Sequence, residues 1–190
     1  MSITINGNGT VTGISAGGLP DGCIQEADLA AGVNTITEAD HWVLTADVDT
    51  NDYNPITTNW ARPNFSGGAV GQIGTGMSES SGIFTFPSTG IWYVSFTAVY
   101  YDAAINKHSN TKIQATSNDS DYHTISINRT SNYRDDGNHY TNAVATTVLD
   151  ITNTSTHKVR FSFDAEHVVT LNGNSGRLET GMIFIRLGDT

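Results

Sequence analysis

Residues 82–101 constrain the fold of this 190-residue chain more than any other segment. A short apolar run ends in a four-residue turn that begins at Pro87 and closes at Gly90, and a longer apolar run follows. Pro87 cannot donate to a sheet ladder and Gly90 tolerates positive φ, so the chain reverses here. In the longer run an apolar or aromatic side chain recurs at every second position, so these side chains would share one face of a strand. This period predicts a strand and excludes a helix. These residues are Trp92, Val94, Phe96, Ala98 and Tyr100.

From His41 onwards the whole chain has this character. Asn, Asp, Ser and Gly turns separate short apolar runs, and no segment has a helical period. Such a pattern predicts an all-β sandwich or jelly roll over residues 41–190. A first strand is expected to place Trp42, Leu44, Ala46 and Val48 on one face. Further strands are expected near 112–116, 122–129, 143–151, 158–164, 168–171 and 181–187.

The last of these runs, Met182 to Leu187, is apolar without alternation. A strand that is apolar on both faces is buried on both faces, and in a sandwich the opposite sheet covers only one of them. We therefore expect a symmetric subunit interface at Ile183, Ile185 and Leu187. The expected core residues are Trp92, Phe96, Phe161, Phe163 and Phe184.

Residues 1–40 differ from the rest. The Asn-Gly turn at 6–9 predicts a small hairpin between its flanking residues, and Asp21 is placed to cap a short helix near 24–31. A Gly-rich linker separates them at 13–18. About 40 residues of this composition cannot bury a stable core alone, so this segment is expected to be ordered against a partner.

Charge and composition exclude several classes of function. The 19 acidic residues outnumber the 9 basic ones, for a net charge of −10, which argues against nucleic acid as a partner. The single cysteine, Cys23, cannot form an intrachain disulfide. The start has no basic and apolar signal pattern and no run long enough to span a bilayer. We expect synthesis and assembly in a cytoplasm, without membrane insertion.

No residue set predicts catalysis. Residues 13–17 match Gly-x-Ser-x-Gly, but neither the parallel strand nor the helix that a nucleophile elbow requires flanks Ser15. Nothing selects a catalytic pair among the carboxylates, and the six histidines lack the close spacing of zinc ligands. The chain is therefore predicted not to be an enzyme.

Two sets of residues are candidates for binding. Asp47, Asp49 and Asn51 place oxygen atoms at alternate positions, as calcium loops do, although Asp52 and Thr58 break the EF-hand pattern. They are weak calcium candidates beside the simpler interpretation, a solvated loop, and no other cofactor is expected. Aromatic residues within polar segments are candidates for contact with sugar or protein. They are Tyr53, Trp60, Tyr122, Tyr133 and Tyr140.

The motif Gly82-x-Phe84-x-x-Pro87-x-x-Gly90 before an aromatic-rich strand resembles the C1q/TNF-like jelly-roll family. The resemblance covers residues 41–190. It implies a homotrimer-forming jelly roll whose terminal strand lies near the trimer axis. The function that the resemblance implies is attachment and not catalysis.

Residues 3–22 resemble the openings of structural proteins from tailed bacteriophages. Together the two resemblances imply a virion protein, a head or tail fibre or a capsid decoration, assembled in the host bacterial cytoplasm. Residues 1–40 would dock to other virion proteins, and the trimer would face outward and bind a host surface glycan by avidity. Two alternatives stay open: a secreted C1q/TNF-like signalling or lectin module, and a small tailspike hydrolase.

Overall fold

The computed structural model describes residues 4–5, 11–12, 36–65, 71–134 and 136–190, and the chain divides into two units, 1–35 and 36–190. In the first unit, β1 (Thr4–Ile5) pairs antiparallel with β2 (Val11–Thr12), with Ile5 opposite Val11. This pairing confirms the expected hairpin. Its turn, the linker, the expected helix near 24–31, Ser15 and Cys23 lie outside the described residues.

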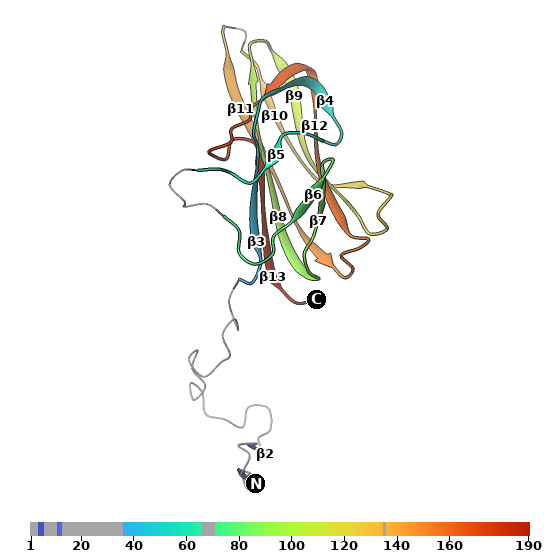
Figure 1. The fold of residues 1–190 in the computed structure, drawn as a ribbon. Coiled ribbons are helices and arrows are strands. Elements are labelled where there is room, and N and C mark those ends of the chain that lie inside the picture. Colours follow the sequence, from blue (N-terminus) through green and yellow to red (C-terminus); the bar gives the residue numbers. More distant parts are fainter. Residues whose placement is uncertain (1–3, 6–10, 13–35, 66–70, 135) are drawn as a thin grey trace. The chain divides into compact units, whose positions relative to one another are not determined.

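In the described residues of the second unit, the secondary-structure elements are all strands (Figure 1). In the same residues there is accordingly no apolar helix of membrane-spanning length. The strands are β3 (Ala39–Leu44), β4 (Val48–Tyr53), β5 (Trp60–Ala61), β6 (Ser78–Ser80), β7 (Ile83–Thr85), β8 (Gly90–Asp102), β9 (Asn106–Thr116), β10 (His123–Asn132), β11 (His139–Ile151), β12 (Lys158–Leu171) and β13 (Gly181–Gly188).

The strands form two layers that join at one corner. One layer has the order β11-β8-β13-β3-β5. The other has the order β10-β9-β12, and β4, β7 and then β6 continue it beyond β12. The end of β12 crosses to the first layer, where Thr170 lies opposite Tyr101 of β8. The result is an antiparallel sandwich that approaches a barrel.

The core between the layers is aromatic. All five expected core residues (Trp92, Phe96, Phe161, Phe163 and Phe184) are fully buried, which confirms the expectation. Burial alternates along the whole of β8, as its sequence predicted. Phe84 of β7 packs edge-on against Trp42 of β3, with ring centroids 5.3 Å apart. Its ring also lies 5.6 Å from Phe184 of β13, so Phe84 ties the two layers together.

A buried carboxylate, Asp40, holds the edge of the first layer. Its side chain accepts hydrogen bonds from Arg62 Nε at 2.9 Å and from Trp42 Nε1 at 2.8 Å. The backbone N–H groups of Met77, at 2.7 Å, and His41, at 3.0 Å, also donate to it. Arg62 in addition places its guanidinium over the Trp42 ring. One acid thus connects β3 to two segments far along the chain.

Two expectations about strands near the start of the domain are wrong. The strand that carries Trp42 and Leu44 ends at Leu44, because the next backbone N–H, that of Thr45, bonds to Asn59 O and the chain leaves the sheet. Ala46 is consequently exposed. The segment around Asp49 is a strand, β4, paired to β12, and not a solvated loop.

Farther along, the segments 158–164 and 168–171 form the single strand β12. Its pairing with β4 has a register irregularity between Asp164 and Val169, which accounts for the interruption in the sequence pattern.

Candidate assembly face and ligand-contact residues

The outward face of β11, β8, β13 and β3 carries neighbouring apolar side chains. Val148, Tyr93 and Ile185 lie opposite one another on three adjacent strands. One row further, Ile183 lies opposite His41 of β3. In that row Ser95 of β8 and Thr146 of β11 lie beside Ile183, so the face combines apolar and small polar side chains. We call it the assembly face, composed of His41, Tyr93, Val144, Val148, Ile183, Ile185 and Leu187.

The three residues expected at a subunit interface all belong to this face. Alternation along β13 buries Met182 and Phe184 in the core and turns Ile183 and Ile185 outward, where they are half-buried. Leu187 is 59% exposed. The apolar residues of β13 therefore form two sets, one that packs in the core and one that lies on the outer face. The interface itself stays a prediction at this point.

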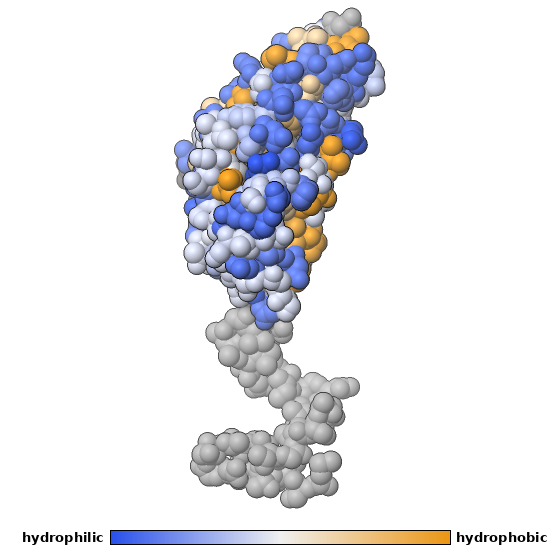
Figure 2. Space-filling model, turned by 90° about the vertical axis from the view of Figure 1, so that its right-hand side faces the viewer, coloured by the Kyte–Doolittle hydropathy of each residue, from blue (hydrophilic) through white to orange (hydrophobic). Residues whose placement is uncertain are grey.

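The apolar surface is unevenly distributed. Figure 2 shows one side of the domain that is largely hydrophilic, with apolar residues gathered along its right-hand margin. On the assembly face, Val148 is 58% exposed, nearly as much as Leu187. Exposed apolar side chains that cluster on one face typically mark an interaction site.

His41 is the residue of the assembly face whose pKa burial shifts. Its Nε2 atom is buried and has no hydrogen-bond partner among the described residues. Burial lowers the pKa of His41, and the nearby Asp40 carboxylate opposes this effect only in part. The folded protein therefore favours the neutral imidazole.

Replacement of His41 is expected to reduce the loss of free energy of unfolding as the pH falls. An unfolded His41 protonates near its ordinary pKa of about 6.5, whereas the folded one resists protonation. The contribution of neutral His41 to the free energy of unfolding is fully present above that pH. It is lost as the pH falls through the lowered pKa of the folded state. His41→Gln should thus lose less stability than wild type between about pH 7.5 and about pH 5.5 in urea denaturation. The exposed His123→Gln is the control, and an equal loss in both variants would contradict the assignment.

Trp60 is not available for ligand contact, which corrects the expectation for this residue. It is buried in the core, where its ring packs against Phe84 and Phe96. Its indole N–H donates to Ile56 O at 2.9 Å. The polar residues beside it in the sequence suggested exposure, but pairing of Trp60 with Leu44 of β3 carries it inside.

Two of the other aromatic candidates, Tyr53 and Tyr122, contact neighbouring side chains of the same chain. The Tyr53 hydroxyl shares hydrogen bonds with Thr57 and Thr58, and these bonds lower the pKa of Tyr53. The Arg160 guanidinium lies 4.1 Å from the ring centroid of Tyr122, and burial is the main cause that raises the pKa of Tyr122. Both residues thus have structural roles within a single chain.

Tyr133 and Tyr140 are the exposed candidates, at 71% and 66%. They flank the connection from β10 to β11, and the Tyr140 ring lies 4.8 Å from that of Tyr101 at the end of β8. The structure therefore places the two at the same end of the sandwich. Their role as ligand contacts stays a prediction.

Two of the three calcium candidates, Asp47 and Asp49, already accept hydrogen bonds within the domain. Asp47 Oδ1 accepts a hydrogen bond from the Gly173 backbone, and Asp49 Oδ1 accepts one from the Thr170 hydroxyl at 2.6 Å. Asn51 lies farther along β4 and is exposed. In the described part of the chain, no group of three or more His, Cys, Asp and Glu residues could hold a metal ion. The arrangement thus gives the calcium hypothesis no support.

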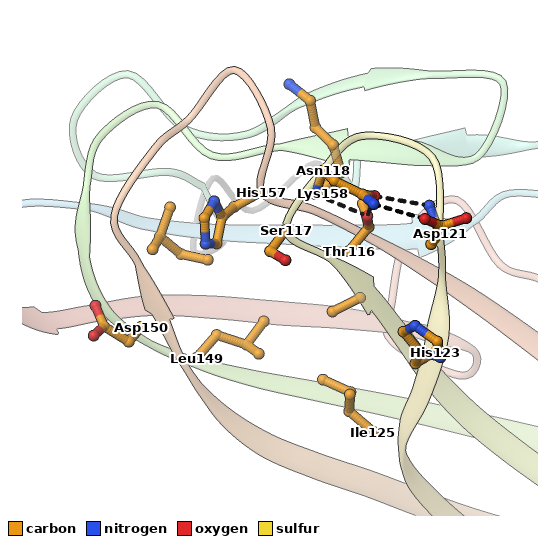
Figure 3. Close-up of a pocket in the computed structure, with 12 residues that line it drawn as sticks. Thr116, Ser117, Asn118, Asp121, His123, Ile125, Leu149, Asp150, His157 and Lys158 are labelled. Carbon is orange, nitrogen blue, oxygen red and sulfur yellow. Dashed lines mark hydrogen bonds between the residues drawn. The ribbon is translucent and has the colours of Figure 1, made fainter.

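Two features of the structure had no signal in the sequence. Asp40 has no motif around it, and only its burial among four donor groups reveals its importance. The other is a pocket whose lining, which includes Ser117, Asp121, His123 and Asp150, comes from four strands and two connections (Figure 3). Residues so far apart in the chain could have been grouped only by the fold.

Comparison with solved structures identifies the type of fold. No protein-family model and no curated protein matches the sequence. Murine APRIL, in a crystal structure at pH 5.0, is 14% identical with a TM-score of 0.56, and the match covers 79% of this chain and 98% of that one. Eiger TNF from S. frugiperda is 12% identical with a TM-score of 0.59, over 80% and 93% of the two chains. The domain is therefore a TNF-like jelly roll, which confirms the predicted fold class.

Proposed function

We propose that this chain is a non-enzymatic binding module that works as a homotrimer, with the assembly face buried between three copies. The observation that carries the proposal is the row Val148, Tyr93 and Ile185, continued by Leu187, on the outside of a sheet whose other side already forms the core. Contact with sister chains would remove the apolar part of this surface from water, which stabilises the assembly by about 25 cal/mol per Å² of apolar area. The TNF-like fold and the C1q/TNF-like motif at 82–90 both favour three copies.

The two ends of the domain suit attachment at one end and display at the other. Ala39, where β3 begins, lies opposite Ile185 near the C-terminus of the chain. Figure 1 shows the C-terminus and β13 at the end of the sandwich where β3 starts. Tyr140 pairs with Tyr101 at the far end of β8. A chain entering through β3 thus leaves Tyr133 and Tyr140 at the distal end.

The finer part of the proposal is the location. Residues 1–40 would attach the trimer to other proteins of a bacteriophage virion, as a fibre or capsid decoration, and the resemblance of residues 3–22 supports this. Antibodies to the domain should label intact particles in electron micrographs. Unlabelled particles would contradict the location and leave the trimer proposal unaffected.

Ile185→Asp is expected to dissociate the trimer. Association would bury the new carboxylate without a partner, and the cost of burying an unpaired charge exceeds the gain from the remaining apolar contacts. Light scattering should give the mass of three chains for wild type and of one chain, or of aggregates, for the variant.

Ile127→Asp provides the matched control. Ile127 is an exposed isoleucine on β10, in the other layer, and it lies opposite Lys112 of β9. The same change of side chain there should leave the mass of the wild type unchanged. A stable trimer of Ile185→Asp would contradict the assembly face, as would dissociation of both variants alike.

A further inference from the structure

The outer side of the second layer carries an ion pair that joins β9 to β12. Asn110 lies opposite Asp164, and Lys112 lies opposite Ser162, so the four side chains are neighbours on one face of the sheet. The Lys112 ammonium group contacts Asp164 Oδ1, and each of these two side chains is only 25% exposed. Asn110 Nδ2 donates to the second carboxylate oxygen, Oδ2, at 2.6 Å. The pair is therefore held between adjacent strands and is largely withdrawn from water.

The contact between Lys112 and Asp164 differs from an ordinary salt bridge. Asp164 Oδ1 is buried and has no hydrogen-bond partner among the described residues, although the ammonium group touches it. The nitrogen thus lies off the directions in which this oxygen accepts hydrogen bonds. On the same two strands Lys107, which is 70% exposed, donates in the usual way to Glu166 Oε1 at 2.8 Å. Lys112 Nζ instead meets the carboxyl group as a nucleophile that attacks its carbon would.

Two further polar atoms at this place lack a partner. Asn110 Oδ1 and Ser162 Oγ are both buried and make no hydrogen bond within the part of the chain that the structure describes. Buried polar atoms in folded proteins are nearly always paired, so unpaired ones require an explanation. Both atoms can accept a hydrogen bond. An amide N–H formed between the two strands would supply the donor that they lack.

The charges around Asp164 also favour a neutral link. Asp52 of β4 lies opposite Asp164 on the other side of β12, and like charges that face each other destabilise a sheet. His108 Nε2 is 4.0 Å from Asp164 Oδ2, too far to donate a hydrogen bond to it. Withdrawal of the Lys112 and Asp164 charges from water carries a desolvation cost. Conversion of the pair to an amide removes both the repulsion and this cost.

We propose that Lys112 and Asp164 form an intramolecular isopeptide bond. A proton passes from the Lys112 ammonium group to Asp164 Oδ1, which leaves an amine and a carboxylic acid. Nζ then bonds to Cγ, the Cγ–Oδ1 bond breaks, and Oδ1 departs as water with a second proton from Nζ. Asn110 Nδ2 donates to Oδ2 and stabilises the negative charge that develops there, as the donors of an oxyanion hole do. The reaction needs no cofactor.

The bond lies within one chain and on the layer that does not carry the assembly face. The inference therefore goes beyond the trimer proposal and does not depend on it. The cross-link would join residues 112 and 164 and close a loop of about 50 residues in the unfolded chain, which stabilises the fold by lowering the entropy of the unfolded state. A domain displayed to the outside would thereby resist unfolding.

Intact-mass spectrometry of the denatured full-length protein tests the inference. The wild-type mass should lie about 18 Da below the mass calculated from the sequence, which is the loss of one water molecule. Lys112→Arg keeps the positive charge and cannot form this amide, and Asp164→Ala removes the carboxyl group. Both variants should have their full calculated masses. Lys112→Arg should also melt about 10 °C below wild type, because the loop is no longer closed.

Lys107→Arg is the matched control. It makes the same substitution on the same strand, in the ion pair with Glu166, and should keep both the loss of water and the melting temperature of wild type. Tandem mass spectrometry of a digest should find Lys112 linked to Asp164.

Three results would overturn the inference. The first is a wild-type protein with its full calculated mass, and the second is a loss of water that persists in Lys112→Arg. The third is a loss of about 17 Da, the mass of ammonia, with Lys112 linked to Asn110. Light scattering of the same samples reports the trimer separately.

Discussion

Asp40→Ala is expected to lower the free energy of unfolding by about 3–5 kcal/mol, the range for breaking a buried charge pair. Asp40 is 2% exposed, and its loss strands the Trp42 indole N–H and the Met77 backbone N–H in the interior. It also removes the partner of Arg62, which approaches Asp40 Oδ2 to 2.8 Å. Urea denaturation measures the change.

Asp52→Ala is the control for this prediction. Asp52 lies on β4, is exposed, and its carboxylate makes no hydrogen bond with the described residues. Its removal should change stability by no more than about 0.5 kcal/mol. An Asp40→Ala variant within about 1 kcal/mol of wild type would show that the network around β3 does not stabilise the fold.

Phe84→Ala is expected to cost about 3–5 kcal/mol as well, through loss of transfer free energy and creation of a cavity. The ring is fully buried and lies within 5.6 Å of three others, those of Trp42, Phe161 and Phe184. Because these partners belong to both layers, the cavity would loosen the contact between the sheets.

Two comparisons make the Phe84 prediction specific. Phe84→Leu keeps most of the volume and should cost clearly less than the alanine variant. Phe65 is about half exposed, so Phe65→Ala should cost less than about 1 kcal/mol in the same thermal or urea experiment. Similar losses at both phenylalanines would contradict the role given to Phe84 between the layers.

Strand patterning made much of the fold predictable. The alternation from Trp92 to Tyr100 fixed both the strand type and its inner face, because neighbouring positions of a strand point to opposite sides. The apolar run at 182–187 predicted a strand, and β13 covers these residues. In the segment from Trp92 to Tyr100 the pattern was long enough to determine a period.

Short or mixed patterns failed for physical reasons. The oxygen-bearing residues from Asp47 to Asn51 alternate, which suits a ligand loop and a half-exposed strand equally, and only pairing with β12 decides between them. Trp60 follows Asn59, whose positive φ of 64° turns the chain so that a two-residue strand can pair with β3. Such contacts depend on distant residues and leave no local signal.

The candidate sites were predictable to different degrees. Ile183, Ile185 and Leu187 could be assigned to an outer face because a single strand carries all three. The pocket lined by Ser117 and His123 could not, because its residues come from separate strands and connections that only the fold brings together.

Sedimentation equilibrium of the wild-type protein tests the central claim most directly. If the assembly face is covered by sister chains, micromolar protein at neutral pH should sediment as a single species with three times the chain mass of 20.3 kDa. A species of one chain mass over the same range of concentrations would leave Val148 and Leu187 in contact with water and would contradict the account.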